Sequence, residues 1–214
     1  MSTETTTRTS LDAQALARVT GGSFTDRWGT EGSDQIHTGD GMDKIFAGGG
    51  NDAIQSGGGT DEVHAGAGND YVNAGAGDDK VFGGDGNDIL DGGAGQDELH
   101  GGSGSDAMTG GAGDHAADKA FGGDGNDSYY WSPGSGNDEF HGDAGTDVLV
   151  LQGMNFSQFE AALKLYDPTL RVQVNAEGVV SFLNQANQAV TFSGEINLGG
   201  ETLKFFDVER VMFA

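Results

Sequence analysis

The chain of 214 residues has no cysteine, only two prolines and no long apolar segment. Without cysteine it forms neither disulfides nor thiolate metal sites, so any crosslink has to be of another kind. No apolar run approaches the ~20 residues of a membrane span, and the amino terminus lacks the apolar centre of a secretory signal peptide. We therefore expect no membrane span, and any export has to use another route.

Basic residues are also scarce, with 10 Lys and Arg against 34 Asp and Glu. Such a surface repels phosphate backbones and anionic membranes and attracts cations, which argues against nucleic-acid binding. What is abundant is glycine, at 40 residues, while only 35% of the chain is hydrophobic. This composition is too poor in apolar residues for a conventional large core, so we expect bound metal ions to hold the fold together.

A nine-residue motif repeats from Gly29 to Val150: Gly-Gly-x-Gly-x-Asp, then three residues with an apolar one in the middle. Thirteen copies fit, with three extra residues near His115 and two extra, Trp131 and Ser132, before the copy that begins at Pro133. The eighth position is apolar throughout and predicts the core. The sixth position is always aspartate, and these residues are the candidate metal ligands: Asp34, Asp43, Asp52, Asp61, Asp70, Asp79, Asp88, Asp97, Asp106, Asp118, Asp127, Asp138 and Asp147.

These repeats resemble those of the RTX, or repeats-in-toxin, calcium-binding family, whose nonapeptide is Gly-Gly-x-Gly-x-Asp-x-U-x with U apolar. The resemblance implies an all-β fold, a right-handed parallel β-roll. Six residues form a calcium-binding turn, three form a short strand, and two copies complete one coil. It further implies that each ion lies between turns of adjacent coils, bound by sixth-position residues such as Asp70 and Asp88 and by carbonyls of the glycine positions. Thirteen turns on two edges then give at most about eleven Ca²⁺ sites.

The residues themselves also favour calcium. Glycines permit positive φ and close backbone approach, so carbonyl oxygens and a carboxylate can face one point. Zinc would require His or Cys and magnesium a stricter octahedron, so a flexible all-oxygen site favours calcium. Positions 29–150 carry 24 Asp and Glu against three Lys, a net charge of −21 that about eleven divalent ions would offset. We expect this segment to be disordered without calcium and folded with it.

The sequence divides into three expected domains: a leader or capping helix (1–22), the roll (23–150) and a carboxy-terminal region (151–214). The first has two open interpretations. It resembles a double-glycine leader cut after Gly22 by a peptidase-containing ABC exporter, in which case the mature protein begins at Ser23. Alternatively, it is a helix that begins after Ser10, ends at Gly21 and covers the first coil. The residues with leader spacing are Leu11, Leu16, Val19, Gly21 and Gly22.

The carboxy-terminal region lacks the glycine-rich nonapeptide motif. Capping-box spacing from Ser157 to Glu160 predicts a short helix over 156–164. Apolar alternation with Gly and Asn punctuation predicts strands over 171–174, 179–183, 189–192, 202–206 and 208–213. We expect a small β-rich cap that closes the end of the roll. Glu209 followed by the apolar residues 211–214 also resembles the uncleaved terminal signal of proteins exported by type I secretion.

Catalytic motifs are missing from the sequence. It contains neither His-Glu-x-x-His nor Gly-x-Ser-x-Gly, and the 64 residues after the roll could not house a separate catalytic domain, so we predict that the protein is not an enzyme. The hypothesis is a secreted, extracellular bacterial protein that folds on binding multiple Ca²⁺ ions and acts as a structural or interaction module at the cell surface or in matrix. Its partners would be calcium and an ABC-type exporter. The alternative is a Ca²⁺-dependent module that binds or targets polysaccharide, resembling those attached to polysaccharide epimerases.

The even-numbered copies carry a second pattern at their seventh and ninth positions, which point away from the core. The seventh alternates Lys and Glu and the ninth Phe and His: Lys44, Phe46, Glu62, His64, Lys80, Phe82, Glu98, His100, Lys119, Phe121, Glu139 and His141. Alternating charge fixes strand register, and Phe–His stacking shelters the rings in part. Because neither explains why Phe46, Phe82 and Phe121 face outward, we predict a contact surface, covered by a terminal segment, by a second copy of the chain or by a partner.

Overall fold

The computed structural model describes residues 25–214. The predicted leader or capping helix of residues 1–22 lies outside these described residues. Within them the chain folds into two long β-sheets and one short helix, α1 (Phe156–Ala162), which confirms the predicted all-β class. Between residues 25 and 214 no helix is long and apolar enough to cross a membrane.

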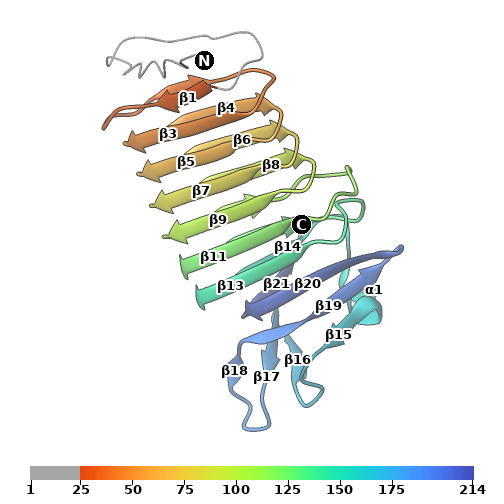
Figure 1. The fold of residues 1–214 in the computed structure, drawn as a ribbon. Coiled ribbons are helices and arrows are strands. Elements are labelled where there is room, and N and C mark those ends of the chain that lie inside the picture. Colours follow the sequence, from red (N-terminus) through yellow and green to blue (C-terminus); the bar gives the residue numbers. More distant parts are fainter. Residues whose placement is uncertain (1–24) are drawn as a thin grey trace.

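Fourteen strands stack as successive coils and form the roll (Figure 1). They are β1 (Thr25–Trp28), β2 (Gln35–His37), β3 (Asp43–Gly49), β4 (Ala53–Gly58), β5 (Glu62–Ala67), β6 (Tyr71–Ala76), β7 (Lys80–Asp85), β8 (Ile89–Ala94), β9 (Glu98–Ser103), β10 (Ala107–Thr109), β11 (Lys119–Gly125), β12 (Ser128–Trp131), β13 (Glu139–Gly145) and β14 (Val148–Leu151). Each of the thirteen copies supplies one strand from β2 onward, and β1 precedes the first copy.

Strands of even and odd copies lie in different sheets, as predicted. One sheet runs β1-β3-β5-β7-β9-β11-β13 through the roll, and the other runs β14-β12-β10-β8-β6-β4-β2. We call the first the even sheet and the second the odd sheet, after the even and odd repeat copies that supply their strands and not after the strand numbers. Neighbouring strands are parallel, and Val63 pairs with Val81, which stands 18 residues later. One coil is therefore two nine-residue copies.

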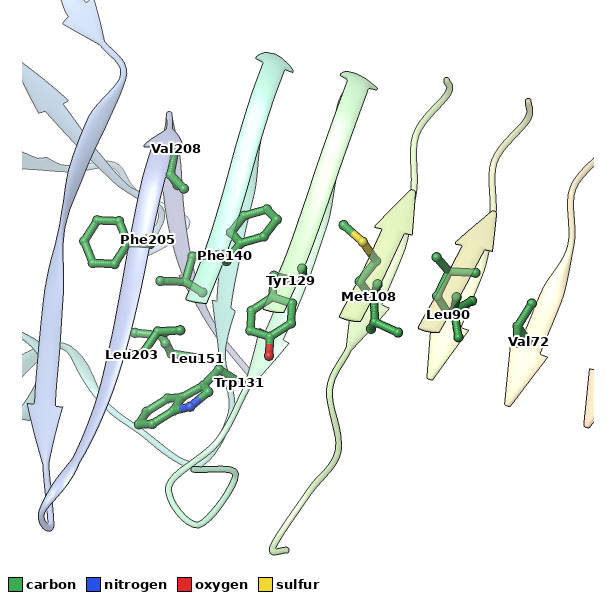
Figure 2. Packing of buried hydrophobic residues seen from close by; sticks show 14 of the residues in the cluster. Val72, Leu90, Met108, Tyr129, Trp131, Phe140, Leu151, Leu203, Phe205 and Val208 are labelled. Carbon is green, nitrogen blue, oxygen red and sulfur yellow. The ribbon is translucent and has the colours of Figure 1, made fainter. Parts of the chain in front are cut away.

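The core of the roll consists of the eighth-position side chains of both sheets, together with the buried alanines Ala47, Ala65 and Ala74. Val72 and Leu90 are completely buried, and the side chains become larger toward the carboxy-terminal end, at Met108, Tyr129 and Phe140 (Figure 2). Trp131, one of the two extra residues in the sequence, is also completely buried there. The roll therefore widens where it meets the rest of the chain.

The residues after Leu151 form the cap (Figure 1). After α1 its elements are β15 (Leu163–Leu165), β16 (Arg171–Val174), β17 (Val180–Leu183), β18 (Ala189–Val190), β19 (Phe192–Leu198), β20 (Glu201–Val208) and β21 (Arg210–Phe213). β20 lies parallel to β13 in the even sheet, and β21 lies parallel to β14 in the odd sheet. The cap therefore continues both sheets by one strand each before its antiparallel strands begin.

Three details of the cap differ from the sequence prediction. The N-cap of α1 is Asn155 and not Ser157: the Asn155 side chain accepts from Gln158 N, and the Gln158 side chain accepts from Asn155 N, each at 3.0 Å. The helix also ends at Ala162, because Leu163–Leu165 pair as a strand with β19. The strand predicted over 189–192 is two strands, and β19 extends it to Leu198.

Candidate metal centre

The turn before most sixth-position aspartates has glycine with positive φ at two places; in the last copy Asp143, with φ of 65°, takes the first of them. In the seventh copy, Gly84 and Gly86 have φ of 116° and 130°, a conformation that L side chains rarely adopt. A Cβ atom on Gly84 would also lie closer than 3.0 Å to the carbonyl oxygen of Gly66 in the preceding coil. Glycine therefore allows the turns of adjacent coils to stack directly on one another.

The sixth-position aspartates form one row along each edge of the roll. Asp70 N donates to Asp88 Oδ1 at 2.8 Å, and Asp88 N donates to Asp106 Oδ1 at the same distance. The bond recurs between successive members of a row, from Asp34 to Asp147 on one edge and from Asp43 to Asp138 on the other. All thirteen candidate ligands are thus brought together, in rows of seven and six.

The second oxygen of most of these carboxylates has no hydrogen-bond partner. Twelve of the thirteen aspartates are buried, and Asp34 is partly exposed. Ten have an Oδ2 atom that is buried and unpaired: Asp52, Asp61, Asp70, Asp79, Asp88, Asp97, Asp106, Asp118, Asp127 and Asp147. A buried carboxylate oxygen without a donor or a cation destabilises the folded chain. This repeated orphan oxygen is what a bound cation would satisfy.

Four of these unpaired oxygens within the roll lie near a carbonyl oxygen of the next coil. A Cβ atom built on Gly83 would lie closer than 3.0 Å to both Asp88 Oδ2 and the carbonyl oxygen of Gly101, which stands one coil further on. The equivalent pair of oxygens surrounds Gly92, Gly101 and Gly122. A carboxylate from one coil and a carbonyl from the following coil therefore converge beside each of these glycines.

Burial makes the charged form of the aspartates unfavourable. Desolvation raises the pKa of Asp97 to about 8, that of Asp106 to about 7 and that of Asp88 to about 6. A backbone amide donor lowers each pKa in part, and the neighbouring aspartates in the row raise it further. A divalent cation in the row would reverse this balance, because opposite charge favours the ionised carboxylate.

The donor set fits calcium. Among the described residues no group of three or more His, Cys, Asp and Glu side chains could hold a metal ion, so side chains alone do not complete a site. Carboxylate and backbone carbonyl oxygens remain, which are the ligands that Ca²⁺ takes in flexible geometry. Asp Oδ2 and the carbonyl at the first position of the next coil are the atoms that would hold it. The bound ion would supply the positive charge that lets these turns stack.

Two aspartates of the rows differ from the others, because their second carboxylate oxygen accepts a hydrogen bond from the protein. Asp34 Oδ2, in the first copy, accepts from Thr30 N at 2.6 Å and from Thr30 Oγ1 at 2.9 Å. Asp138 Oδ2, in the last even copy, accepts from the hydroxyl of buried Tyr129 at 3.1 Å. A protein donor therefore occupies the second oxygen of Asp34 and of Asp138.

One acidic residue of the cap joins the odd row although it lies outside the repeats. Asp147 N donates to Glu209 Oε2 at 2.5 Å, where each earlier aspartate of the row donates to the next one. The sequence pattern had indicated Glu209 only as part of a terminal secretion signal. The available sequence signal was an acidic residue directly before a strand with the apolar pattern of Arg210–Phe213.

The outer face of the even sheet carries the predicted aromatic ladder. Neighbouring rings stack at centroid separations of 4.5 to 4.9 Å with interplanar angles of 9° to 16°. In order along the sheet, the rings belong to Trp28, Phe46, His64, Phe82, His100, Phe121, His141 and Phe206. The ladder thus begins in β1 and ends in the cap, one strand beyond the repeats on either side.

The charged ladder runs beside the rings. Glu62 Oε1 lies 2.6 Å from Lys44 Nζ of the preceding strand and 2.7 Å from His64 Nε2 of its own strand. Glu98 has the same two partners, Lys80 and His100. These contacts confirm that the Lys–Glu alternation pairs neighbouring strands and that Phe–His stacking shelters the rings in part. That a partner covers this face stays a prediction.

A comparison with protein families identifies the repeat. The family described as RTX calcium-binding nonapeptide repeat (4 copies) matches residues 28–63, 55–90, 82–114, 116–130 and 134–151, more than half of the chain. The two breaks between the matched segments coincide with the extra residues at His115 and at Trp131–Pro133. No curated protein matches the chain.

Proposed function

The chain belongs to the RTX calcium-binding nonapeptide repeat family, and we propose that it is a secreted bacterial protein whose roll folds when it binds several Ca²⁺ ions. Once folded, it acts as a structural or interaction module outside the cell, and it has no catalytic role. RTX repeats are typical of bacterial proteins exported by type I secretion, so the exporter is an ABC transporter.

The unpaired Asp Oδ2 atoms carry this proposal. Nine of the ten, from Asp52 to Asp127, belong to coils that another coil of the same roll follows. Without a cation the roll would bury a row of carboxylates against one another along each edge, and positions 29–150 would keep their net charge of −21. Folding is therefore coupled to metal binding, since a site that exists only in the folded chain converts binding free energy into folding free energy.

This coupling suits export through a narrow transporter. At cytosolic calcium levels the charged segment repels itself and stays extended, and an extended chain can be threaded. Extracellular calcium modules typically bind with dissociation constants of about 10⁻⁴ to 10⁻³ M. The chain would therefore fold after it leaves the cell and not before.

The even face is the candidate interaction surface, through the edges of Phe46, Phe82 and Phe121. Their ring faces are covered by neighbouring rings of the ladder. Carbohydrate binding is the weaker candidate for this surface, because aromatic side chains bind sugars mainly through their exposed faces. A protein partner or a second copy of the chain can use ring edges together with the charges beside them.

A calcium titration of the full chain tests the proposal. Far-ultraviolet circular dichroism of the chelated protein should show a disordered chain, and addition of Ca²⁺ should produce a cooperative β signal with a midpoint of about 10⁻⁴ to 10⁻³ M. Mg²⁺ at the same concentrations should not produce it. A β signal that is equally strong in excess chelator at neutral pH would contradict calcium-coupled folding.

A further inference from the structure

The last repeat of the odd row is followed by a segment of the cap that imitates a repeat turn. β21 lies parallel to β14, with Val148 opposite Arg210. Glu209 directly precedes Arg210, as Asp147 directly precedes Val148. The backbone nitrogens of Glu209 and Arg210 both donate to the Asp147 carbonyl at 3.1 Å, and the Glu209 side chain accepts from Asp147 N. Glu209 therefore occupies the place of the next sixth-position aspartate.

The oxygens that converge in the roll also converge at this junction. Asp147 is completely buried, and its Oδ2 atom has no partner. A Cβ atom built on Gly142 would lie closer than 3.0 Å to both Asp147 Oδ2 and the carbonyl oxygen of Asp207. One coil earlier, Gly122 is surrounded in the same way by Asp127 Oδ2 and the carbonyl oxygen of Gly142. The Asp207 carbonyl therefore stands where a repeat presents its first-position carbonyl.

The other edge of the roll meets the cap without an orphan oxygen. Thr202 N donates to Asn137 Oδ1 at 2.8 Å, and Lys204 N donates to the Asp138 carbonyl at 2.9 Å. There, however, the Tyr129 hydroxyl satisfies Asp138 Oδ2. The two edges thus share the same backbone continuation into the cap, and only the odd edge leaves a buried carboxylate oxygen for a ligand.

We propose that Asp147 Oδ2, the Asp207 carbonyl and the Glu209 carboxylate form an additional Ca²⁺ site that joins the last coil to the cap. The inference rests on the proposed calcium binding by the roll, and it adds a site that no pair of repeats can form. The ion would offset two carboxylate charges that the structure places side by side, and it would tie β21 to the turn between β13 and β14. Docking of the cap is therefore controlled by calcium at one edge and by a tyrosine hydroxyl at the other.

Substitution of Glu209 separates the ion from the hydrogen bond. Glu209→Gln removes one charge but keeps a side-chain oxygen that can accept from Asp147 N. Native mass spectrometry in calcium should show one Ca²⁺ fewer per chain than the parent, and hydrogen exchange should become faster in β21 while β4 to β10 are unchanged. Asp147→Asn should give the same loss by a second route, should Glu209→Gln prove difficult to fold.

One control variant should keep the parent's ion count. Glu177→Gln changes an exposed acidic residue elsewhere in the cap.

The outcomes are distinguishable. If Glu209→Gln and Asp147→Asn bind as many ions as the parent, the junction site is wrong while calcium-coupled folding stands. Faster hydrogen exchange in β21 without loss of an ion would also overturn the proposed junction site, since Glu209 would then act only through its hydrogen bond. If the parent itself binds no Ca²⁺, the proposed function fails and not only this site.

Discussion

The roll and the cap share both sheets but are held together by different forces. The roll has a core made mainly of one apolar side chain per repeat, and it buries twelve aspartates. The cap buries an aromatic cluster that includes Phe159, Phe182, Phe192 and Phe205, and no aspartate or glutamate of residues 152–214 is buried. The same backbone ladder can therefore be stabilised by cations in one region and by apolar burial in the next. The two regions should respond differently to every condition that changes charge.

Removal of calcium should have the largest effect, and it should be confined mainly to the roll. In excess chelator at neutral pH the amides of β4 to β12 should lose all protection from hydrogen exchange, because no cation then offsets the negative charge of the aspartate rows. Part of the protection around Phe182 and Phe192 should survive, since apolar burial does not depend on the ion. Equal loss of protection in both regions would show that the cap has no stability of its own.

Acidification of the chelated protein should partly replace calcium. Burial in the folded roll raises the pKa of several row aspartates: to about 6 at Asp52 and Asp79, to about 7 at Asp106 and to about 8 at Asp97. The folded roll therefore binds more protons than the unfolded chain between about pH 4 and pH 8, and its stability rises as the pH falls through this window. Circular dichroism in chelator should show more β structure at about pH 5 than at about pH 8. The calcium midpoint should move to higher concentration at the lower pH, and the absence of both changes would contradict the burial of these carboxylates.

Substitution of one row member should weaken the roll locally. Asp88→Ala removes an orphan oxygen and the acceptor for Asp70 N, so at least one ion should be lost. At a calcium concentration of about 100 times the dissociation constant, each lost site lowers the free energy of unfolding by about 2.7 kcal/mol. Hydrogen exchange should become faster in β6, β8 and β10 before the cap is affected, because stacked repeats couple to their nearest neighbours.

The matched control for this substitution is Asp85→Ala in the same turn. Asp85 is exposed and lies outside the row, so its loss should leave the ion count unchanged. Equal calcium stoichiometry for Asp88→Ala and Asp85→Ala would remove Asp88 from the ligand set.

The smallest effect is expected from the outer ladder, which crosses from the roll into the cap at Phe206. Phe82 stacks between His64 and His100, so Phe82→Ser removes two ring pairs worth about 0.5 to 1.5 kcal/mol each. The thermal midpoint in saturating calcium should fall while the ion count stays the same. If the even face is a contact surface, self-association in sedimentation experiments or binding of a partner should weaken as well.

Tyr71→Ser serves as the control on the odd sheet. Tyr71 is 43% exposed and stacks on no ring among the described residues, so its loss should change stability little. If Phe82→Ser behaves like Tyr71→Ser in stability and in association, the alternation along the even face serves only to fix strand register.

Most of the roll follows from the sequence, because its period sets every contact. A step of nine residues fixes which copies share a sheet, and a constant Asp at the sixth position fixes the two rows. The junction with the cap did not follow, because no glycine marks it. Lys204 and Phe206 continue the Lys and Phe alternation with the correct spacing, but they stand 65 residues after their partners Glu139 and His141 in the last repeat strand of the sheet. The closure of Asp138 by Tyr129 depends on the reach of a core side chain to the edge, which a linear pattern does not contain.

The Lys–Glu and Phe–His ladder on the even face restricts how the gene that encodes this chain can change in length. Its unit is not one coil but two, because Lys44 and Phe46 recur at Lys80 and Phe82, 36 residues later. Duplication or deletion of nine codons would exchange the two sheets for everything downstream. A change of 18 codons would restore the sheets but set Lys against Lys and Glu against Glu in the next strand pair. Only blocks of 36 codons insert or delete without a mismatch, so related proteins that keep the ladder should differ in length by multiples of this block.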